Sequence, residues 1–255
     1  SLVSIGLNLS AQIDSAKYYF DKANNSKDYQ TKIDNYTKCI RINPDYKDAY
    51  FNRGIANGNL GNYQLAIDDF SKAIQINPDD SDAYNNRGIG YDELGKYKLA
   101  IHDYTSAIRI NPKDAESYYN RGVVYYELSK YQLAIDDYTS AIQINPYDTD
   151  AYINRGVAYR ELGQYQLAIN DYNSAIQINR DDAYAYLNRG NTYNNLGQYQ
   201  DAVDDYGRAI KINSDYAKAY YNRGTAKKNL KLEYCSDYKK ACELGICGNY
   251  NTFCK

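Results

Sequence analysis

The chain has 255 residues, and its 30 lysine and arginine residues nearly balance 32 aspartate and glutamate residues, giving a formal net charge of -2. This balance gives no reason to expect a nucleic acid or an anionic membrane surface as a partner. No apolar stretch approaches the ~20 residues that a membrane span needs, so no integral membrane segment is expected.

The first eleven residues, from Ser1 to Ala11, form an apolar stretch that ends in small residues. This pattern is typical of the end of a secretory signal peptide, with cleavage after Ala11. The alternative is a frayed first turn of a helix, and the sequence holds no basic leader that would decide between the two. A signal-peptide remnant over residues 1–12 would favour an exported, periplasmic or extracellular protein over a cytoplasmic one.

A repeat of constant length organises the rest of the chain. The tripeptide Asn-Arg-Gly occurs six times, and its glycines stand at positions 54, 88, 122, 156, 190 and 224, a spacing of 34 residues (88 − 54, for example). A fixed period between ~20 and ~50 residues indicates stacked units that bury their apolar faces against one another. The four prolines follow the same interval, at Pro44, Pro78, Pro112 and Pro146.

Each repeat predicts two helices, as residues 81–114 show. Tyr84, Gly88 and Tyr91 have the spacing of one helical stripe, and Gly95 can end this first helix. A second apolar set with helical spacing follows over residues 96–110, and Pro112 stops it, because proline disfavours helix at the residue before it. The sequence therefore predicts an antiparallel helix pair in every repeat.

The signature of the tetratricopeptide repeat is matched, in order and spacing, by Tyr84, Gly88, Tyr91, Ala100, Tyr104, Ala107 and Pro112, so this unit resembles that family. The resemblance implies an all-α fold, a right-handed superhelical solenoid of antiparallel helix pairs whose first helices line the concave surface. Residues 13–46 would be a degenerate first repeat, residues 47–216 five full repeats, and residues 217–255 a shortened last repeat with a cysteine-rich capping helix.

An arginine precedes each repeat glycine, as Arg87 precedes Gly88, and an aspartate recurs in each second helix, as at Asp103. Both are absent from residues 13–46, where Tyr19 and Asn35 replace them. Their joint loss predicts a structural pair in which the arginine forms a fork to the carboxylate. The functional alternative is a basic ligand site.

Each first helix also carries an asparagine on the face turned away from the packed tyrosine. Asparagine favours neither helix formation nor core packing, whereas its amide offers the donor and the acceptor needed to bracket a peptide backbone. The pattern resembles the asparagine ladders of the repeat domains in O-linked N-acetylglucosamine transferase and kinesin light chain, which hold extended peptides. The alternatives are that each asparagine bonds a neighbouring repeat or was copied by duplication. The ladder consists of Asn52, Asn86, Asn120, Asn154, Asn188 and Asn222.

Charged and aromatic side chains surround this ladder. Acidic residues dominate the first four full repeats, whereas later repeats become neutral or basic. We expect an extended protein or peptide partner with basic and aliphatic side chains, its acidic end toward residue 228, and the alternative is a solvated helix face. Besides the ladder, the expected peptide-binding residues are Asp82, Glu93, Glu116, Tyr126, Glu127, Asp150, Arg160 and Lys218.

The sequence thus predicts a non-catalytic protein-binding scaffold. His102 is the only histidine, and no phosphate loop, catalytic triad or metal-ligand spacing is present, so neither an enzyme nor a cofactor is expected. One alternative is a scaffold that self-associates through its ends or its convex, tyrosine-rich surface. Another is a co-chaperone-type clamp for a C-terminal carboxylate, which fits less well because Asn222 stands where the clamp has an arginine and Lys218 is its single well-placed cation. The partner and the oligomeric state stay open.

Four of the five cysteines lie near the C-terminal end. Cys235 and Cys242 are seven residues apart on one helix, hence ~10.5 Å along its axis, beyond the ~4.4–6.8 Å between the Cα atoms of a disulfide. We expect nested disulfides, Cys235 with Cys254 and Cys242 with Cys247, about a turn at Gly245 in an oxidising compartment, with free thiols as the alternative. This end is similar to cysteine-rich Sel1-like repeats, and no Cys-x-x-Cys spacing supports zinc.

Overall fold

The computed structural model describes residues 14–254, so the expected signal-peptide remnant over residues 1–12 lies outside the described residues. Within this range the chain consists of helices joined by short turns, and no strand occurs. The predicted all-α fold is confirmed, whereas the handedness of a superhelix stays a prediction. The chain divides into two compact units, Ser1–Val124 and Tyr125–Lys255, and each is described by itself.

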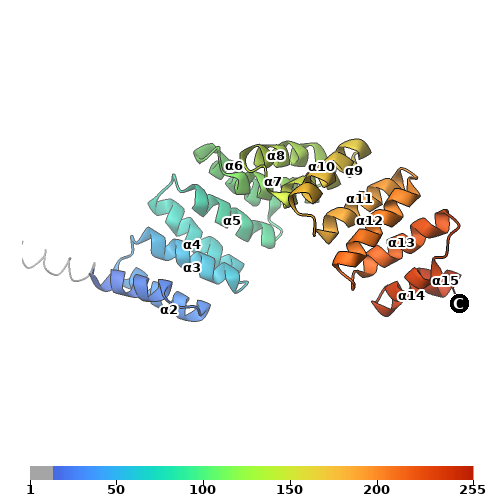
Figure 1. Cartoon of the computed structure of the whole chain (residues 1–255). Coiled ribbons are helices and arrows are strands. Elements are labelled where there is room, and N and C mark those ends of the chain that lie inside the picture. The colour runs from blue at the N-terminus through green and yellow to red at the C-terminus, as the bar shows by residue number, and fades with distance from the viewer. Residues whose placement is uncertain (1–13, 255) are drawn as a thin grey trace, which may run out of the picture. The chain divides into compact units, whose positions relative to one another are not determined.

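Unit 1 is a stack of antiparallel helices, in which each helix from α2 to α5 packs against the next (Figure 1). The first helices of two consecutive repeats, α3 and α5, also contact each other. The unit contains helical residues 14–24, α2 (Tyr29–Ile42), α3 (Lys47–Asn59), α4 (Tyr63–Ile76), α5 (Ser81–Glu93), α6 (Tyr97–Ile110) and most of α7 (Ala115–Glu127).

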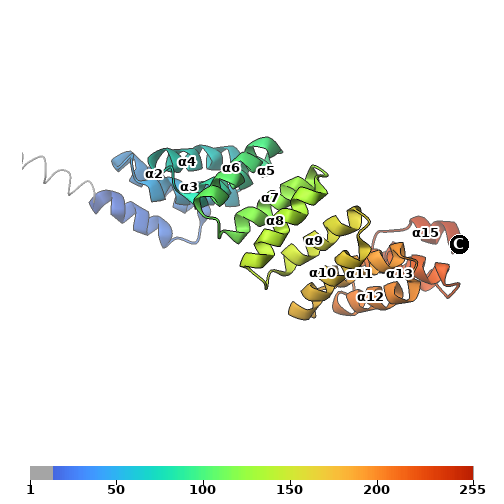
Figure 2. The same ribbon diagram turned by 90° about the horizontal axis from the view of Figure 1, so that it is seen from above.

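Unit 2 repeats this arrangement, with each helix from α8 to α15 packed against its successor (Figure 2). Here the first helices α9, α11 and α13 contact one another in turn. The unit contains the end of α7, α8 (Tyr131–Ile144), α9 (Thr149–Glu161), α10 (Tyr165–Ile178), α11 (Ala183–Asn195), α12 (Tyr199–Ile212), α13 (Ala217–Asn229), α14 (Cys235–Glu243) and α15 (Gly248–Phe253).

Local sequence signals set the helix ends. The carboxylate of Asp80 accepts a hydrogen bond from the Ala83 amide at 3.1 Å and so caps the start of α5. Gly95 follows that helix with a φ of +67°, a left-handed conformation that glycine adopts without cost. Ser129 occupies the same place in the next repeat with a φ of 56°. Helix α6 ends at Ile110, just before the proline that was predicted to stop it.

The core of each pair is an aromatic ring that lies on the repeat glycine. In the pair α5–α6, Tyr104 is 1% exposed, and a Cβ added at Gly88 would lie 2.7 Å from its Cε1. A side chain at this position would therefore have to displace a fully buried ring. The same close contact joins Gly54 to Phe70, Gly156 to Tyr172, Gly190 to Tyr206 and Gly224 to Tyr238.

The repeated arginine and aspartate form the expected fork. Nε and Nη2 of Arg87 donate to the two carboxylate oxygens of Asp103 at 2.7 and 2.8 Å, and Asp103 is 1% exposed. Nη1 of the same arginine donates to Ser71 Oγ of the preceding repeat at 3.0 Å. Arg87 therefore joins its own helix pair to the pair before it, and Arg53, Arg155 and Arg189 do the same through Thr37, Thr139 and Asn173. The same fork joins Arg53 to Asp69, Arg155 to Asp171, Arg189 to Asp205 and Arg223 to Asp237.

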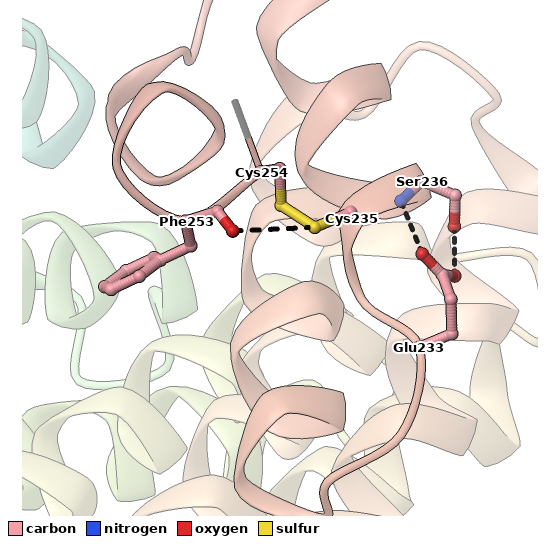
Figure 3. Close-up of a disulfide and its surroundings, with 5 residues drawn as sticks. All are labelled: Glu233, Cys235, Ser236, Phe253 and Cys254. Atoms are coloured by element: carbon pink, nitrogen blue, oxygen red, sulfur yellow. Dashed lines mark hydrogen bonds between the residues drawn. A yellow bond between two sulfur atoms is a disulfide. The ribbon is translucent and has the colours of Figure 1, made fainter.

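Two disulfides fasten the C-terminal end, and they are the two pairs expected from the sequence. Cys235 bonds Cys254 with 5.6 Å between their Cα atoms, and Cys242 bonds Cys247 with 3.9 Å. Figure 3 shows the first bond joining the residue after α15 to the start of α14. The similarity of this end to Sel1-like repeats stays a prediction.

Candidate peptide-binding face

The repeat asparagines all lie in the middle of first helices. Five of them are half-buried, and Asn188 is 4% exposed. We call the surface that they mark the asparagine face, and consider it separately in each unit. Its asparagines are Asn52 on α3, Asn86 on α5, Asn120 on α7, Asn154 on α9, Asn188 on α11 and Asn222 on α13.

The amides of this face bond in different ways. Nδ2 of Asn86 donates to the Asp82 carbonyl oxygen of its own helix at 2.8 Å. Nδ2 of Asn120 instead donates at 3.2 Å to Oδ1 of Asn85, on the preceding first helix. Bonding to a neighbouring repeat, one of the roles expected from the sequence, therefore occurs at Asn120. At Asn86 one N–H of the amide bonds the helix backbone, which leaves Oδ1 and the second N–H for other partners.

A cavity of about 280 Å³ opens on the asparagine face of unit 1, between α3 and α5. Ile55 and Ile89 supply apolar wall, while Asn86 and Glu93 supply polar rim. Gly58 contributes no side chain, and a Cβ added there would meet no atom within 4 Å. Two of the predicted residues, Asn86 and Glu93, are thus brought together around one space.

Acidic side chains dominate the same face of unit 1. Asp82, Glu93 and Glu116 are exposed, and none of them forms an ion pair in the described part of the chain. Tyr63 bonds Glu93, and this hydrogen bond to a carboxylate raises the pKa of the Tyr63 hydroxyl. The face therefore presents carboxylates without an opposing cation.

A second cavity, of about 300 Å³, lies on the asparagine face of unit 2 and has a polar lining that includes Arg160 and Asn222. Nη1 of Arg160 donates to Asn188 Oδ1 at 3.2 Å, and Nη2 bonds Glu161 at 3.1 Å. Nδ2 of Asn222 donates to Asn191 Oδ1 at 2.8 Å. Two predicted residues, Arg160 and Asn222, line this cavity, and Arg160 also bonds a third, Asn188. The guanidinium keeps further N–H groups for a ligand.

The other predicted residues of unit 2 lie outside this cavity. Glu127, Asp150 and Lys218 are exposed. Tyr126 is half-buried, and its ring centroid lies 5.4 Å from that of Tyr131. These four predicted residues share the first helices with the ladder but do not line the space beside Arg160.

Two lysines of the last repeat are engaged within the protein. Lys227 pairs with Asp237 at 2.8 Å, and Nζ of Lys228 lies 3.1 Å from the centroid of the Phe253 ring. The positive charge expected near residue 228 is therefore partly neutralised by Asp237 of α14 and partly stacked on Phe253 of α15. Lys218 is the exposed cation at this end of the face.

Sequence-based prediction missed Gly58, Asn191 and Asn194, all of which line a cavity. Their signal was a departure from the repeat. Gly58 stands where the next repeat has Asp92, and Asn191 stands where earlier repeats have an apolar residue such as Ile89. Oδ1 of Asn194 is buried without a hydrogen-bond partner in the described residues.

Other chemistry finds little support in the part of the chain that the structure describes. No group of three or more histidine, cysteine, aspartate or glutamate side chains there could hold a metal ion. His102 is exposed on α6. None of the described helices combines the length and the apolar character needed to cross a membrane.

Three solved structures illustrate the likeness of this fold to known proteins. A tetratricopeptide repeat protein from Parabacteroides merdae superposes with a TM-score of 0.71 at 22% identity, covering 91% of this chain and 94% of that one. YrrB, a TPR protein with an unusual peptide-binding site, has a TM-score of 0.63 at 24% identity, covering 73% and 96%. MamA has a TM-score of 0.61 at 27% identity, covering 65% and 96%. No curated protein matches the chain in sequence.

Family models described as tetratricopeptide repeats match residues 48–80, 70–102, 115–148, 138–170 and 183–216, and one described as a TPR repeat matches residues 90–129 and 157–197. Together these matches run from residue 48 to residue 216 without a gap, which is more than half of the 255 residues. The chain therefore belongs to the tetratricopeptide repeat family.

Proposed function

We propose that this protein is a non-catalytic scaffold that binds an extended segment of a partner polypeptide along its asparagine face. One observation carries the proposal. In each unit this face holds a cavity of side-chain size, and a ladder residue lines it, Asn86 in unit 1 and Asn222 in unit 2. YrrB, which shares the fold, is a TPR protein with an unusual peptide-binding site, and this supports the role by analogy of fold.

The spacing of the ladder suits a peptide backbone. Neighbouring packed helices lie ~8–10 Å apart, and an extended chain advances ~3.3 Å per residue. One asparagine would therefore meet every second or third residue of the partner. Each amide–backbone hydrogen bond would contribute about 1 kcal/mol, and bonds at Asn86 and at its neighbours within a unit would add along the segment.

The charges of the two units suggest which side chains the partner carries. In unit 1, unpaired carboxylates beside Ile55 and Ile89 would suit basic and aliphatic side chains. In unit 2, Arg160 and Lys218 would suit an acidic group. A co-chaperone-type carboxylate clamp is less well supported, because the Nδ2 of Asn222 already bonds a neighbouring asparagine.

Peptide selection followed by a matched pair of variants tests the proposal. Peptides selected from a random display library on the immobilised protein would be synthesised with a fluorophore, and their dissociation constants measured by fluorescence anisotropy. The double variant Asn86→Ala, Asn120→Ala in unit 1 should bind about thirtyfold more weakly, since two bonds of ~1 kcal/mol are lost. The control replaces two exposed amides on second helices of the same unit by alanine, at Gln30 and Gln64, and should bind like the wild type. Equal loss in both variants, or none in the first, would remove the ladder from the account.

A row of exposed leucines favours self-association as a second candidate function. These leucines recur at the same position of the second helices, and a contiguous apolar patch formed by them would be typical of an interaction site. Light scattering would distinguish the two functions: a mass that grows with concentration supports the scaffold, whereas a monomer with saturable peptide binding supports the peptide-binding face. The leucines are Leu65 (55% exposed) and Leu99 (47%) in unit 1, and Leu133 (45%) and Leu167 (45%) in unit 2.

A further inference from the structure

We infer that the cavity between α3 and α5 in unit 1 accepts a single lysine side chain of the bound polypeptide. The inference rests on the proposed function and adds the residue type that this position selects. Three features support it: a rim of hydrogen-bond acceptors, a carboxylate without an ion pair, and apolar walls around a space that a glycine keeps open.

The rim includes acceptors, because two asparagines each direct one N–H into their own helix and keep Oδ1 as an acceptor. Nδ2 of Asn59 donates to the Ile55 carbonyl oxygen at 2.9 Å, and Nδ2 of Asn86 donates to the Asp82 carbonyl oxygen at 2.8 Å. Both residues line the cavity. The Glu93 carboxylate adds a third acceptor group. An ammonium group, with three donors and no acceptor, matches such a rim.

The charges around the cavity also favour a lysine side chain. Glu93 forms no ion pair in the described residues, and its bond from the Tyr63 hydroxyl leaves its negative charge uncompensated. Asp82 and Glu116 add further unpaired carboxylates to this face. An entering ammonium would supply the missing opposite charge, and a hydrogen bond between two charged groups is stronger than one between neutral groups.

The walls suit the stem of lysine. Ile55, which is 36% exposed, and Ile89 line the cavity below the rim. Lysine packs its methylene groups along apolar surface while its ammonium group stays at the polar edge. Acceptors on both α3 and α5 favour this compact ion, whose donors rotate freely, over the flat fork of arginine.

Glycine at position 58 distinguishes this cavity from the equivalent one in unit 2, where the side chain of Asn194 lines the space. The equivalent positions carry side chains, which would project into the corresponding space in their own repeats. A side chain at position 58 would meet no atom of the protein within 4 Å of its Cβ, so the cavity can be filled without disturbing the helices. The equivalent residues are Asp92, Tyr126, Arg160, Asn194 and Lys228.

The test selects peptides from the random display library on four forms of the full chain. Wild type and Gly58→Ala should both enrich lysine at one position of the selected peptides, because alanine leaves most of the cavity open. Gly58→Tyr, which fills the cavity, and Glu93→Gln, which removes the charge but keeps the shape, should select peptides without that lysine. Asp79→Asn, the same loss of charge on an exposed turn, serves as control and should keep the preference.

Synthetic peptides make the test quantitative. Replacing the selected lysine by norleucine keeps the stem and removes the ammonium, and should weaken binding to wild type about tenfold, but binding to Glu93→Gln by less than about twofold. Equal effects on both proteins, or arginine that binds as well as lysine, would overturn the inference while leaving the proposed function intact. Failure of the wild type to select any peptide would overturn both.

Discussion

The fork between Arg87 and Asp103 offers the sharpest test of how the repeats are held together. Replacing Arg87 by methionine keeps an apolar stem and removes the guanidinium. Asp103, which is 1% exposed, then keeps its charge without a cation, and Ser71 loses its donor. This variant therefore isolates a buried carboxylate inside one helix pair and also cuts a bond to the preceding pair.

The expected loss follows from burial. Removing one partner of a buried ion pair costs about 3–5 kcal/mol. The Arg87 side chain is 17% exposed, so water can partly replace it and we expect the lower end, about 3 kcal/mol. In the double variant Arg87→Met, Asp103→Leu no charge is left buried, and its stability should return to within about 1 kcal/mol of the wild type. The double variant should therefore be more stable than the single one.

Urea unfolding followed by far-UV circular dichroism measures the free energy of unfolding of the three proteins. Because a repeat protein sums local terms, hydrogen exchange of the α5 and α6 amides should report the same loss locally. A single variant that loses less than about 1 kcal/mol, or a double variant less stable than the single, would refute a structural role for the fork. In that case the basic-site alternative for Arg87 would return.

Three further predictions concern other parts of the chain. Cys39 is 0% exposed, and burial raises the pKa of its thiol to about 11. Iodoacetamide at neutral pH should therefore label this thiol at least ~100-fold more slowly in the folded protein than in the urea-unfolded protein. Equal labelling rates would contradict this burial. Because the unfolded pKa is ~8.5, the stability linked to this neutral thiol is complete below that pH and is lost as pH rises through about 11. The two C-terminal disulfides predict an intact mass four hydrogen atoms below that of the reduced chain, and reduction should speed hydrogen exchange in α15; an unchanged mass would show free thiols. Gly207 occupies the position equivalent to Ser71, and a Cβ added there would lie 3.8 Å from Nη1 of Arg223. The variant Gly207→Ser should therefore raise the free energy of unfolding by about 1–1.5 kcal/mol, through helix propensity and a new hydrogen bond to Arg223. The same gain in an Arg223→Lys background would mean that this hydrogen bond does not form.

The fold followed from the sequence because its signals repeat and act locally. Gly88 and its equivalents must be small where a ring packs, and Pro112 and its three equivalents follow four of the second helices, so the period alone located the helix pairs. The fork was predictable as well, because both partners disappear together from the degenerate repeat. These features depend on contacts that every full repeat makes in the same way.

The bonding of the asparagine face could not be predicted, because it depends on residues that differ between repeats. Asn120 bonds Asn85, which stands where a later repeat has Ile153. Asn222 bonds Asn191, which again replaces an apolar residue. An amide that repeats in sequence thus acquires different partners in different repeats, and the partners of Asn120 and Asn222 are not visible until the helices are packed. The cavities could not be predicted for the same reason, since each arises where residues depart locally from the repeat sequence.

Side-chain amide signals offer the most direct measurement of the central claim. In a ¹⁵N-labelled protein, the NH₂ signals of Asn86 and Asn120 on the asparagine face and of Asn170, exposed on α10, can be assigned by single substitutions to alanine. Titration with a selected peptide should shift the signals of Asn86 and Asn120 with one common dissociation constant and leave that of Asn170 in place. Saturable binding that moves the Asn170 signal while both asparagine-face signals stay unchanged would contradict the account.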